Sequence, residues 1–148
     1  SATTIAIGQV SPSTQHLLEV TRRTLELAME LIRPGRMWSE VASRMQAFVE
    51  GERLSVVREF VGHGIGRDMH EEPKVPNFWN DSQKRMDFKL LPKMVLAVEP
   101  MVNLGGHAVD YAGDDRWVVV TKDRKNAAHF EHTLAVTEGG VDVLTDGR

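Results

Sequence analysis

After one short β-rich segment at its start, this chain has two helical patterns, and the other β-rich segments follow them. Residues 12–32 and 38–49 space their apolar side chains three and four positions apart, as an amphipathic helix does. Ser11 and Pro12 suit the N-cap and the first helical position, and Pro34-Gly35 should end the first helix. Helices segregated from strands along a chain are typical of an α+β domain.

Six segments have the β-branched and apolar composition of strands. They are residues 3–7, 54–61, 94–103, 117–121, 129–137 and 141–144. Residues 73–92 are polar and contain Pro, Asn, Asp and Lys, so we expect a loop there. The 148 residues suffice for one core. We therefore predict a single domain over residues 1–148, with two antiparallel helices packed on a curved, mostly antiparallel sheet.

Charge and composition exclude several classes of partner. The formal net charge is −3 with both signs interspersed, which predicts no binding to nucleic acid. The longest apolar run, residues 94–98, is far too short to span a membrane. The chain has no cysteine, which excludes disulfide scaffolds and cysteine-based zinc sites. No signal peptide is visible, and we expect a cytoplasmic location.

Charged and imidazole side chains stand where the strand pattern calls for apolar ones. The stretch FVGHGIGRDMHEEP, residues 60–73, places His63 among glycines, while Glu99 and Glu131 interrupt the apolar runs VLAVEPMV and AHFEHTLAV. A carboxylate in such a strand is costly to bury unless it is paired or bound to a metal. The three residues come from three expected strands, so they could converge on one divalent cation such as Mn²⁺, Fe²⁺, Co²⁺ or Zn²⁺.

The pattern by itself leaves simpler interpretations open. His63 could be an ordinary hydrogen-bonded residue at a strand end, and the glycines beside it could mark a β-bulge. Glu99 could lie on a solvent-facing register. Glu131 and His132 could form an exposed pair.

Four motifs in a fixed order carry more information than spacing. ERLSVVREF, GHGIGRDMHEEP, VLAVEPMVN and TKDRKNAAHFEHTLAVT together resemble the type I methionine aminopeptidases. The resemblance runs from about Thr3 to Thr145 and implies the C-terminal half of the pita-bread fold, which this family shares with aminopeptidase P, prolidase and creatinase. It implies a metal-dependent hydrolase that removes the initiator methionine from new proteins when the second residue is small.

The resemblance implies three metal ligands, which are His63, Glu99 and Glu131. Glu131 would bridge two metals in a complete site and is also expected to act in catalysis. The family's other two ligands are aspartates that precede the matching region, and here no acidic residue precedes Glu19. We therefore expect one divalent metal per chain, and two only where the missing aspartates are supplied. The chain alone is expected to be weakly active or inactive.

The resemblance also implies residues that contact the substrate. His70 matches the histidine that contacts the substrate and stabilises the tetrahedral intermediate. Phe60 and Trp117 lie where the family lines its methionine pocket and the wall of its active site. Lys93 and Arg116 stand where the family commonly has glycine, which puts the geometry of two loops in question.

Half of a pita-bread domain would expose a sheet edge and an apolar seam. A separate chain carrying the first half could cover that seam, or two copies could pair about a twofold axis. Three functions then stay open. The first is a hydrolase acting on peptide N-termini with such a partner. The second is a catalytically incomplete half that binds a metal or peptides without turnover, and the third is a structural relic.

Overall fold

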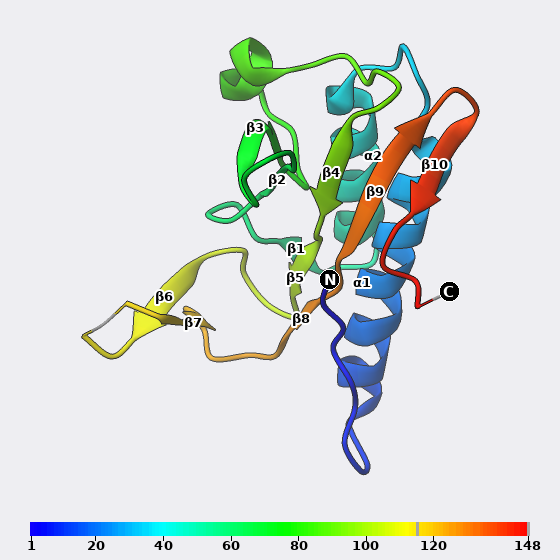
Figure 1. The fold of residues 1–148 in the computed structure, drawn as a ribbon. Helices are drawn as coiled ribbons and strands as arrows, with labels where there is room; N and C mark the ends of the chain where they lie inside the picture. The colour runs from blue at the N-terminus through cyan, green and yellow to red at the C-terminus, as the bar shows by residue number, and fades with distance from the viewer. Residues whose placement is uncertain (115, 148) are drawn as a thin grey trace.

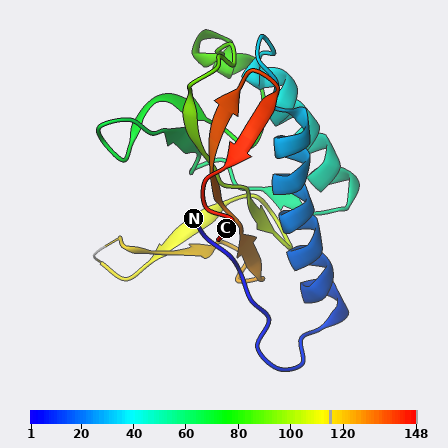
Figure 2. The same cartoon turned by 45° about the vertical axis from the view of Figure 1, so that its right-hand side comes forward.

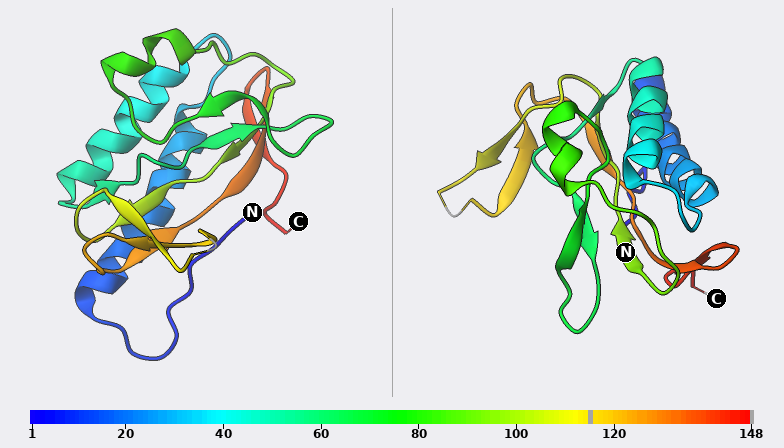
Figure 3. Two further views of the ribbon diagram at one scale, coloured as in Figure 1. Left: turned by 90° about the vertical axis from the view of Figure 1, so that its left-hand side faces the viewer. Right: turned by 90° about the horizontal axis from the view of Figure 1, so that it is seen from above.

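The computed structural model describes residues 1–114 and 116–147. Helices α1 (Pro12–Leu31) and α2 (Trp38–Gly51) pack together as one layer, and the larger sheets lie against them (Figures 1 and 3). This arrangement confirms the α+β class. No helix formed by the described residues is long and apolar enough to cross a membrane. The other elements are β1 (Ser55–Val56), β2 (Gly62–Gly64), β3 (Glu71–Val75), η1 (Asp81–Met86), β4 (Val95–Val98), β5 (Met101–Asn103), β6 (Val109–Ala112), β7 (Val118–Thr121), β8 (Ala127–His129), β9 (His132–Thr137) and β10 (Gly140–Val143).

The described strands pair antiparallel in three groups. One sheet has the order β10-β9-β4-β2-β3, another has the order β1-β5-β8, and β6 and β7 form a hairpin that projects away from the helices (Figures 1 and 2). Two chain segments run through both larger sheets, one as β4 and β5 and the other as β8 and β9. The expected curved sheet is therefore interrupted, at residues 99–100 in one segment and 130–131 in its neighbour.

Local signals account for the start of α1. The Ser11 side chain accepts a hydrogen bond of 3.2 Å from the backbone N–H of Thr14, and Pro12 occupies the first turn, where its missing N–H costs nothing. The helix ends before Pro34-Gly35 as predicted, and Gly35 adopts a φ of 86°. Capping chemistry in neighbouring residues therefore sets where the helix begins and ends, while its buried face packs on the sheets.

The core divides into two clusters that follow the break in the sheet. Trp38 and Leu134 belong to the cluster under the five-stranded sheet. Leu17 and Val102 belong to the cluster under the three-stranded sheet. Phe130 lies in the break and packs against both clusters. The two sheets thus have separate cores joined at one aromatic side chain.

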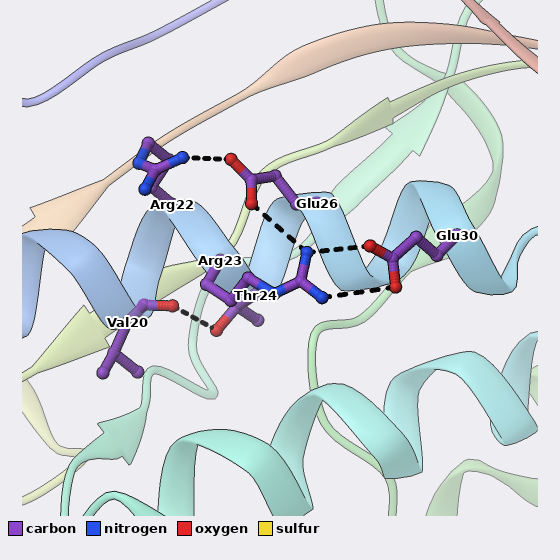
Figure 4. Close-up of polar contacts among 6 residues, drawn as sticks. All are labelled: Val20, Arg22, Arg23, Thr24, Glu26 and Glu30. Carbon is purple, nitrogen blue, oxygen red and sulfur yellow. Dashed lines mark hydrogen bonds and ion pairs between the residues drawn. The ribbon is translucent and has the colours of Figure 1, made fainter.

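The solvent-facing side of α1 carries charges that pair along the helix (Figure 4). Arg23 Nη1 lies 2.8 Å from Glu30 Oε1 and 3.3 Å from Glu26 Oε2, and Arg22 also pairs with Glu26. Hydrogen bonds to Glu30 and then to Glu26 raise the pKa of Arg23 above its ordinary value, because they stabilise the charged guanidinium. The charges on this face satisfy one another.

The predicted strand over residues 3–7 is wrong. Only Ala2 pairs, in an isolated bridge with Glu131, and the segment then runs as irregular chain. Ile5 is 71% exposed and Ile7 is 88% exposed. A β-branched stretch forms a strand only when another strand lies beside it, and composition alone cannot report that.

Other expected strands are shorter or divided. Residues 54–61 contain only β1, and residues 94–103 and 129–137 are each split in two by the sheet break. The expected loop at 73–92 is wrong in part, because β3 reaches Val75 and η1 lies inside it. The strand β6 was not predicted. Its sequence, VDYA, is too short and too polar to be recognised without its hairpin partner β7.

Four described non-glycine residues have a φ in the left-handed region, and two of them, Lys93 and Arg116, were singled out in the sequence. Lys93 has a φ of 76° and Arg116 a φ of 55°. These are the two positions at which the sequence departs from the expected glycine. The Lys93 N–H donates to the carbonyl of Val136 at 2.8 Å, and the Arg116 guanidinium lies 4.8 Å from the ring centre of Tyr111. Both loops therefore keep the glycine-like geometry at a conformational cost.

Candidate functional site

Strand β2 holds His63 between two glycines that its neighbours require. A Cβ on Gly62 would lie 2.2 Å from the carbonyl oxygen of Ala97, and one on Gly64 would lie 2.4 Å from that of Glu72. The pairing register also shifts between His63 and Gly64, so the β-bulge considered from sequence is present. Glycine at both positions lets β3 and β4 close on the backbone that carries His63.

The ring of His63 is oriented with Nε2 toward Glu99. Its Nδ1 lies 2.9 Å from the carbonyl oxygen of Gly64, which can only accept, so Nδ1 carries the proton. Nε2 is then the nitrogen directed at Glu99, 3.7 Å from Oε1, and it carries the lone pair whenever the ring is neutral. The two side chains are only 17% and 16% exposed. Two acceptors that face each other with little solvent favour a cation between them.

Glu99 leaves β4 at the break in the sheet. Its carbonyl accepts a 3.1 Å hydrogen bond from the buried amide of Asn77, and Pro100 follows with no N–H to continue the ladder. The second carboxylate oxygen, Oε2, lies 3.6 Å from His129 Nε2. The sequence analysis missed His129. The available signal was its position two residues before Glu131, which would place both on one face of a continuous strand.

Glu131 lies in the matching break between β8 and β9. Its backbone N–H donates to the Ala2 carbonyl at 2.8 Å, and Ala2 N–H donates back at 3.3 Å. Its largely buried carboxylate lies 3.5 Å from the α-amino nitrogen of Ser1. The pairs β4–β9 and β5–β8 flank the two breaks, so Glu99 and Glu131 emerge from adjacent segments.

His70 lies in the turn between β2 and β3. Its ring centre is 4.1 Å from that of His63, with the two planes tilted by 43°. His70 is exposed whereas His63 is mostly buried, so a molecule approaching from solvent reaches His70 first. This placement suits a hydrogen-bond donor to a bound substrate.

A cavity of about 390 Å³ lies beside these residues. Its walls are mostly apolar side chains of β5, β7 and β8, together with Phe60 and the ring of His129. The buried Asn103 also lines it, and Asn103 Oδ1 has no hydrogen-bond partner among the described atoms. Trp117 is not among the described residues around this cavity and is 85% exposed. The structure therefore places Phe60, but not Trp117, on the wall of a pocket.

The donor set fits a divalent metal, although the side chains do not enclose one as they stand. Within residues 1–114 and 116–147, no three His, Asp or Glu side chains are close enough together to hold an ion. Two donors on one tetrahedral metal lie about 3.4 Å apart, given ligand bonds of about 2.1 Å. The 3.7 Å between His63 Nε2 and Glu99 Oε1 needs only a small movement to match. The ligand set of His63, Glu99 and Glu131 stays a prediction.

Comparison with known proteins bears on this site. Residues 1–138 match metallopeptidase family M24. The chain is 46% identical over 145 residues to Methionine aminopeptidase 1 of Bacillus subtilis (strain 168), a match that covers 98% of this chain and 57% of that protein. A solved methionine aminopeptidase from Thermotoga maritima is 39% identical with a TM-score of 0.87, covering 94% of this chain and 54% of that one.

A more distant likeness concerns the fold alone. The prolidase from Pyrococcus horikoshii OT3 is 19% identical with a TM-score of 0.68, over 97% of this chain and 35% of that one. The chain spans about half the length of the curated relatives that it matches.

Proposed function

Because the chain belongs to metallopeptidase family M24, we propose that it forms part of a metal-dependent hydrolase that removes N-terminal methionine from peptides. The observation that carries this proposal is the pair of His63 and Glu99. Their acceptor atoms face each other at 3.7 Å in a mostly buried place, and the carbonyl of Gly64 directs the lone pair of His63 toward the carboxylate. The similarity to methionine aminopeptidases supplies the substrate class.

The residues then have distinct roles. His63, Glu99 and Glu131 would hold one Mn²⁺, Fe²⁺, Co²⁺ or Zn²⁺ per chain. When bound, such an ion supplies Lewis-acid polarisation of the peptide carbonyl and activation of water. Glu131 would also act in catalysis, through a carboxylate that is 20% exposed beside the break in the sheet. His70 donates a hydrogen bond to the carbonyl oxygen.

We also propose that a second chain, carrying the remaining half of the domain, completes the site. The chain spans about half the length of its relatives, and Ile5, Ile7, Met69 and Trp117 are large apolar side chains left in solvent. A partner that covers them removes apolar surface from water. Sedimentation of an equimolar mixture with such a chain should give a heterodimer. A homodimer would favour pairing of two copies, and a monomer that hydrolyses peptides unaided would overturn both forms of assembly.

Metal binding and turnover are tested separately. Calorimetric titration of metal-free protein with Co²⁺ and with Mn²⁺ should give one ion per chain. The Glu99→Ala variant should lose that ion, and Glu26→Ala, a carboxylate on the outer face of α1, should retain it. Hydrolysis of a Met-Ala peptide should require both the metal and the remaining half. Absence of metal binding with that half present would overturn the proposal.

A second function is favoured by one observation. The described side chains do not yet enclose a metal, as an incomplete site would not. A half that binds a metal or peptides without turnover would show calorimetric binding of Co²⁺ with no release of methionine, even after addition of the remaining half. Turnover in that mixture would exclude this alternative.

A further inference from the structure

We propose that His129 is a positioning residue for the carboxylate of Glu99. In this arrangement the Nε2–H of His129 holds Oε2, and Oε1 is left facing the ion together with His63. The inference rests on the proposed metal site, because positioning matters only if Glu99 is a ligand. Nothing in the motif pattern assigns His129 a role.

The first support is the symmetry of contacts around the carboxylate. Oε1 lies 3.7 Å from the Nε2 of His63, and Oε2 lies 3.6 Å from the Nε2 of His129. Among the described residues, these two rings are the side chains that lie against the two carboxylate oxygens. A carboxylate that is only 16% exposed needs donors for its lone pairs. One ring is turned with its lone pair inward, so the other ring is left to donate.

The second support is the unused nitrogen of His129. Its Nε2 is fully buried and has no hydrogen-bond partner among the described atoms. The 3.6 Å contact with Glu99 is slightly longer than a hydrogen bond, and a small rotation of either side chain closes it. Buried polar atoms without partners are rare in native proteins, and this one already points at a suitable acceptor.

The third support is that the backbone of His129 is fixed. The hydroxyl of Thr4 donates to the carbonyl oxygen of His129 at 2.8 Å and accepts from its N–H at 2.9 Å. On the other side, β8 pairs with β5, with His129 opposite Met101. Contacts on both sides therefore fix the backbone from which the His129 ring extends, as is expected of a residue that orients a metal ligand.

The geometry favours positioning over direct ligation. The two rings face different oxygens of Glu99, so an ion beside Oε1 and His63 would not lie next to the His129 ring. A hydrogen bond from His129 would keep the carboxylate from rotating and would bias Oε1 toward the ion. Partners of this kind typically change metal affinity by about 10–100-fold.

The test compares three variants of the full chain by calorimetry with Mn²⁺ and Co²⁺. His129→Leu should weaken metal binding by about 10–100-fold, because the donor is lost. His129→Gln should keep most of the affinity, because its carboxamide N–H can donate to the same oxygen. His16→Leu removes an exposed imidazole near the start of α1, where it contacts Glu52, and should leave metal affinity unchanged.

Several outcomes would overturn the inference. Unchanged affinity in His129→Leu would remove the positioning role and leave the metal site intact. Equal loss in both His129 variants, with a fall from two to one in the number of histidines bound to Co²⁺ by X-ray absorption, would make His129 a ligand instead.

A measurement on the metal-free parent protein separates this inference from the proposed function. Nitrogen-15 NMR of the imidazoles should show His129 with its proton on Nε2, and this resonance should move in Glu99→Gln. If His129 carries its proton on Nε2 but the protein binds no metal, the proposed function is overturned while the contact between His129 and Glu99 stands. A His129 ring protonated on Nδ1 alone would sink the inference, whether or not the variants fold.

Discussion

Carboxylates occur in two contrasting regions of this molecule, the outer face of α1 and the break in the sheet. On α1, Glu26 and Glu30 lie beside arginines of the same helix, within hydrogen-bond distance. In the break, the carboxylate of Glu99 faces two imidazole nitrogens at 3.6 and 3.7 Å, beyond that distance. On α1 each of these carboxylates has a cationic partner within hydrogen-bond distance, whereas the two imidazoles beside Glu99 lie beyond that distance.

The comparison shows that pairing, rather than residue type, distinguishes a site from a surface. The helix charges pair at spacings of three, four and seven residues along one helix face and are screened by solvent. The break places its carboxylates where water is scarce, on segments whose backbones are fixed by Asn77 and by Ala2. A polar group that is fixed in position but has no hydrogen-bonding or ionic partner is therefore evidence for a site.

The largest expected effect tests whether β2, the strand that carries His63, tolerates displacement from its neighbour β3. Gly64→Ala places a Cβ 2.4 Å from the carbonyl oxygen of Glu72, so β3 must move. We expect the free energy of unfolding to fall by about 1–3 kcal/mol, together with a loss of metal affinity. Gly139→Ala is the control, because no atom lies within 4 Å of the added carbon. Equal urea midpoints for the two variants would mean that β2 deforms freely.

The second test asks whether replacing a carboxylate by an amide changes the free energy of unfolding in opposite directions in the two regions. In metal-free protein, Glu99→Gln removes a charge that faces a lone pair and adds a donor toward His63. We expect the free energy of unfolding to rise by about 0.5–1.5 kcal/mol, while metal affinity falls. Glu26→Gln should instead lower stability slightly, because it breaks contacts with Arg22 and Arg23. The same sign for both variants in chemical denaturation would remove the contrast between the regions.

The third test measures strain in the turn that precedes β4. Lys93, at φ 76°, precedes the segment that carries Glu99. Lys93→Gly should raise the free energy of unfolding by about 0.5 kcal/mol, since relief of left-handed strain slightly exceeds the added entropy of the unfolded chain. Lys93→Ala should give no gain in thermal unfolding. A gain in the alanine variant would point to the side chain rather than to the backbone.

The smallest effect concerns an exposed carboxylate bonded to backbone. The N–H of Gly106, and then that of Lys125, donate to Asp123 and lower its pKa below the ordinary value of 3.8, because they bind the charged form. The resulting stability is present above pH 3.8 and is lost as the pH falls through the lowered pKa.

Urea unfolding of the parent and of Asp123→Asn across this range checks the sign. The parent should be more stable at pH 6, and the two curves should converge in acid. A difference that grows on acidification would contradict the assignment. Asp123 would then resemble neither the paired carboxylates of α1 nor the carboxylate of Glu99 in the sheet break.

Local signals predicted more of the fold than distant ones. Both helices were predicted because caps and periodicity lie within a few residues of each other, as at Ser11 and Pro34. The break at residues 99–100 was not predicted, because VLAVEPMVN reads as one apolar strand. Pro100, which has no N–H for the ladder, was a local signal for this break, whereas the matching break at residues 130–131 has no such signal in its own segment.

The site follows the same rule. Glu99 and Glu131 were selected because a charge in an apolar run is conspicuous. His129 lies two residues before Glu131 in the same run, and the structure singles it out by its 3.6 Å distance to Glu99. The resemblance to type I methionine aminopeptidases and the pita-bread fold are confirmed by the comparisons. The metal ligands, the substrate role of Trp117, the single domain over residues 1–148 and the cytoplasmic location stay predictions.

The two cores joined at Phe130 have a mechanical consequence. Helix α1 supplies Leu17 to one cluster and Leu25 to the other, so a tilt between the two sheets would disturb the packing of the helix as well as that of the ring. The helix layer therefore acts as a rigid backing for the break that carries Glu99 and Glu131. An ion held between those two segments would add a second tie, on the side of the sheets away from the helices.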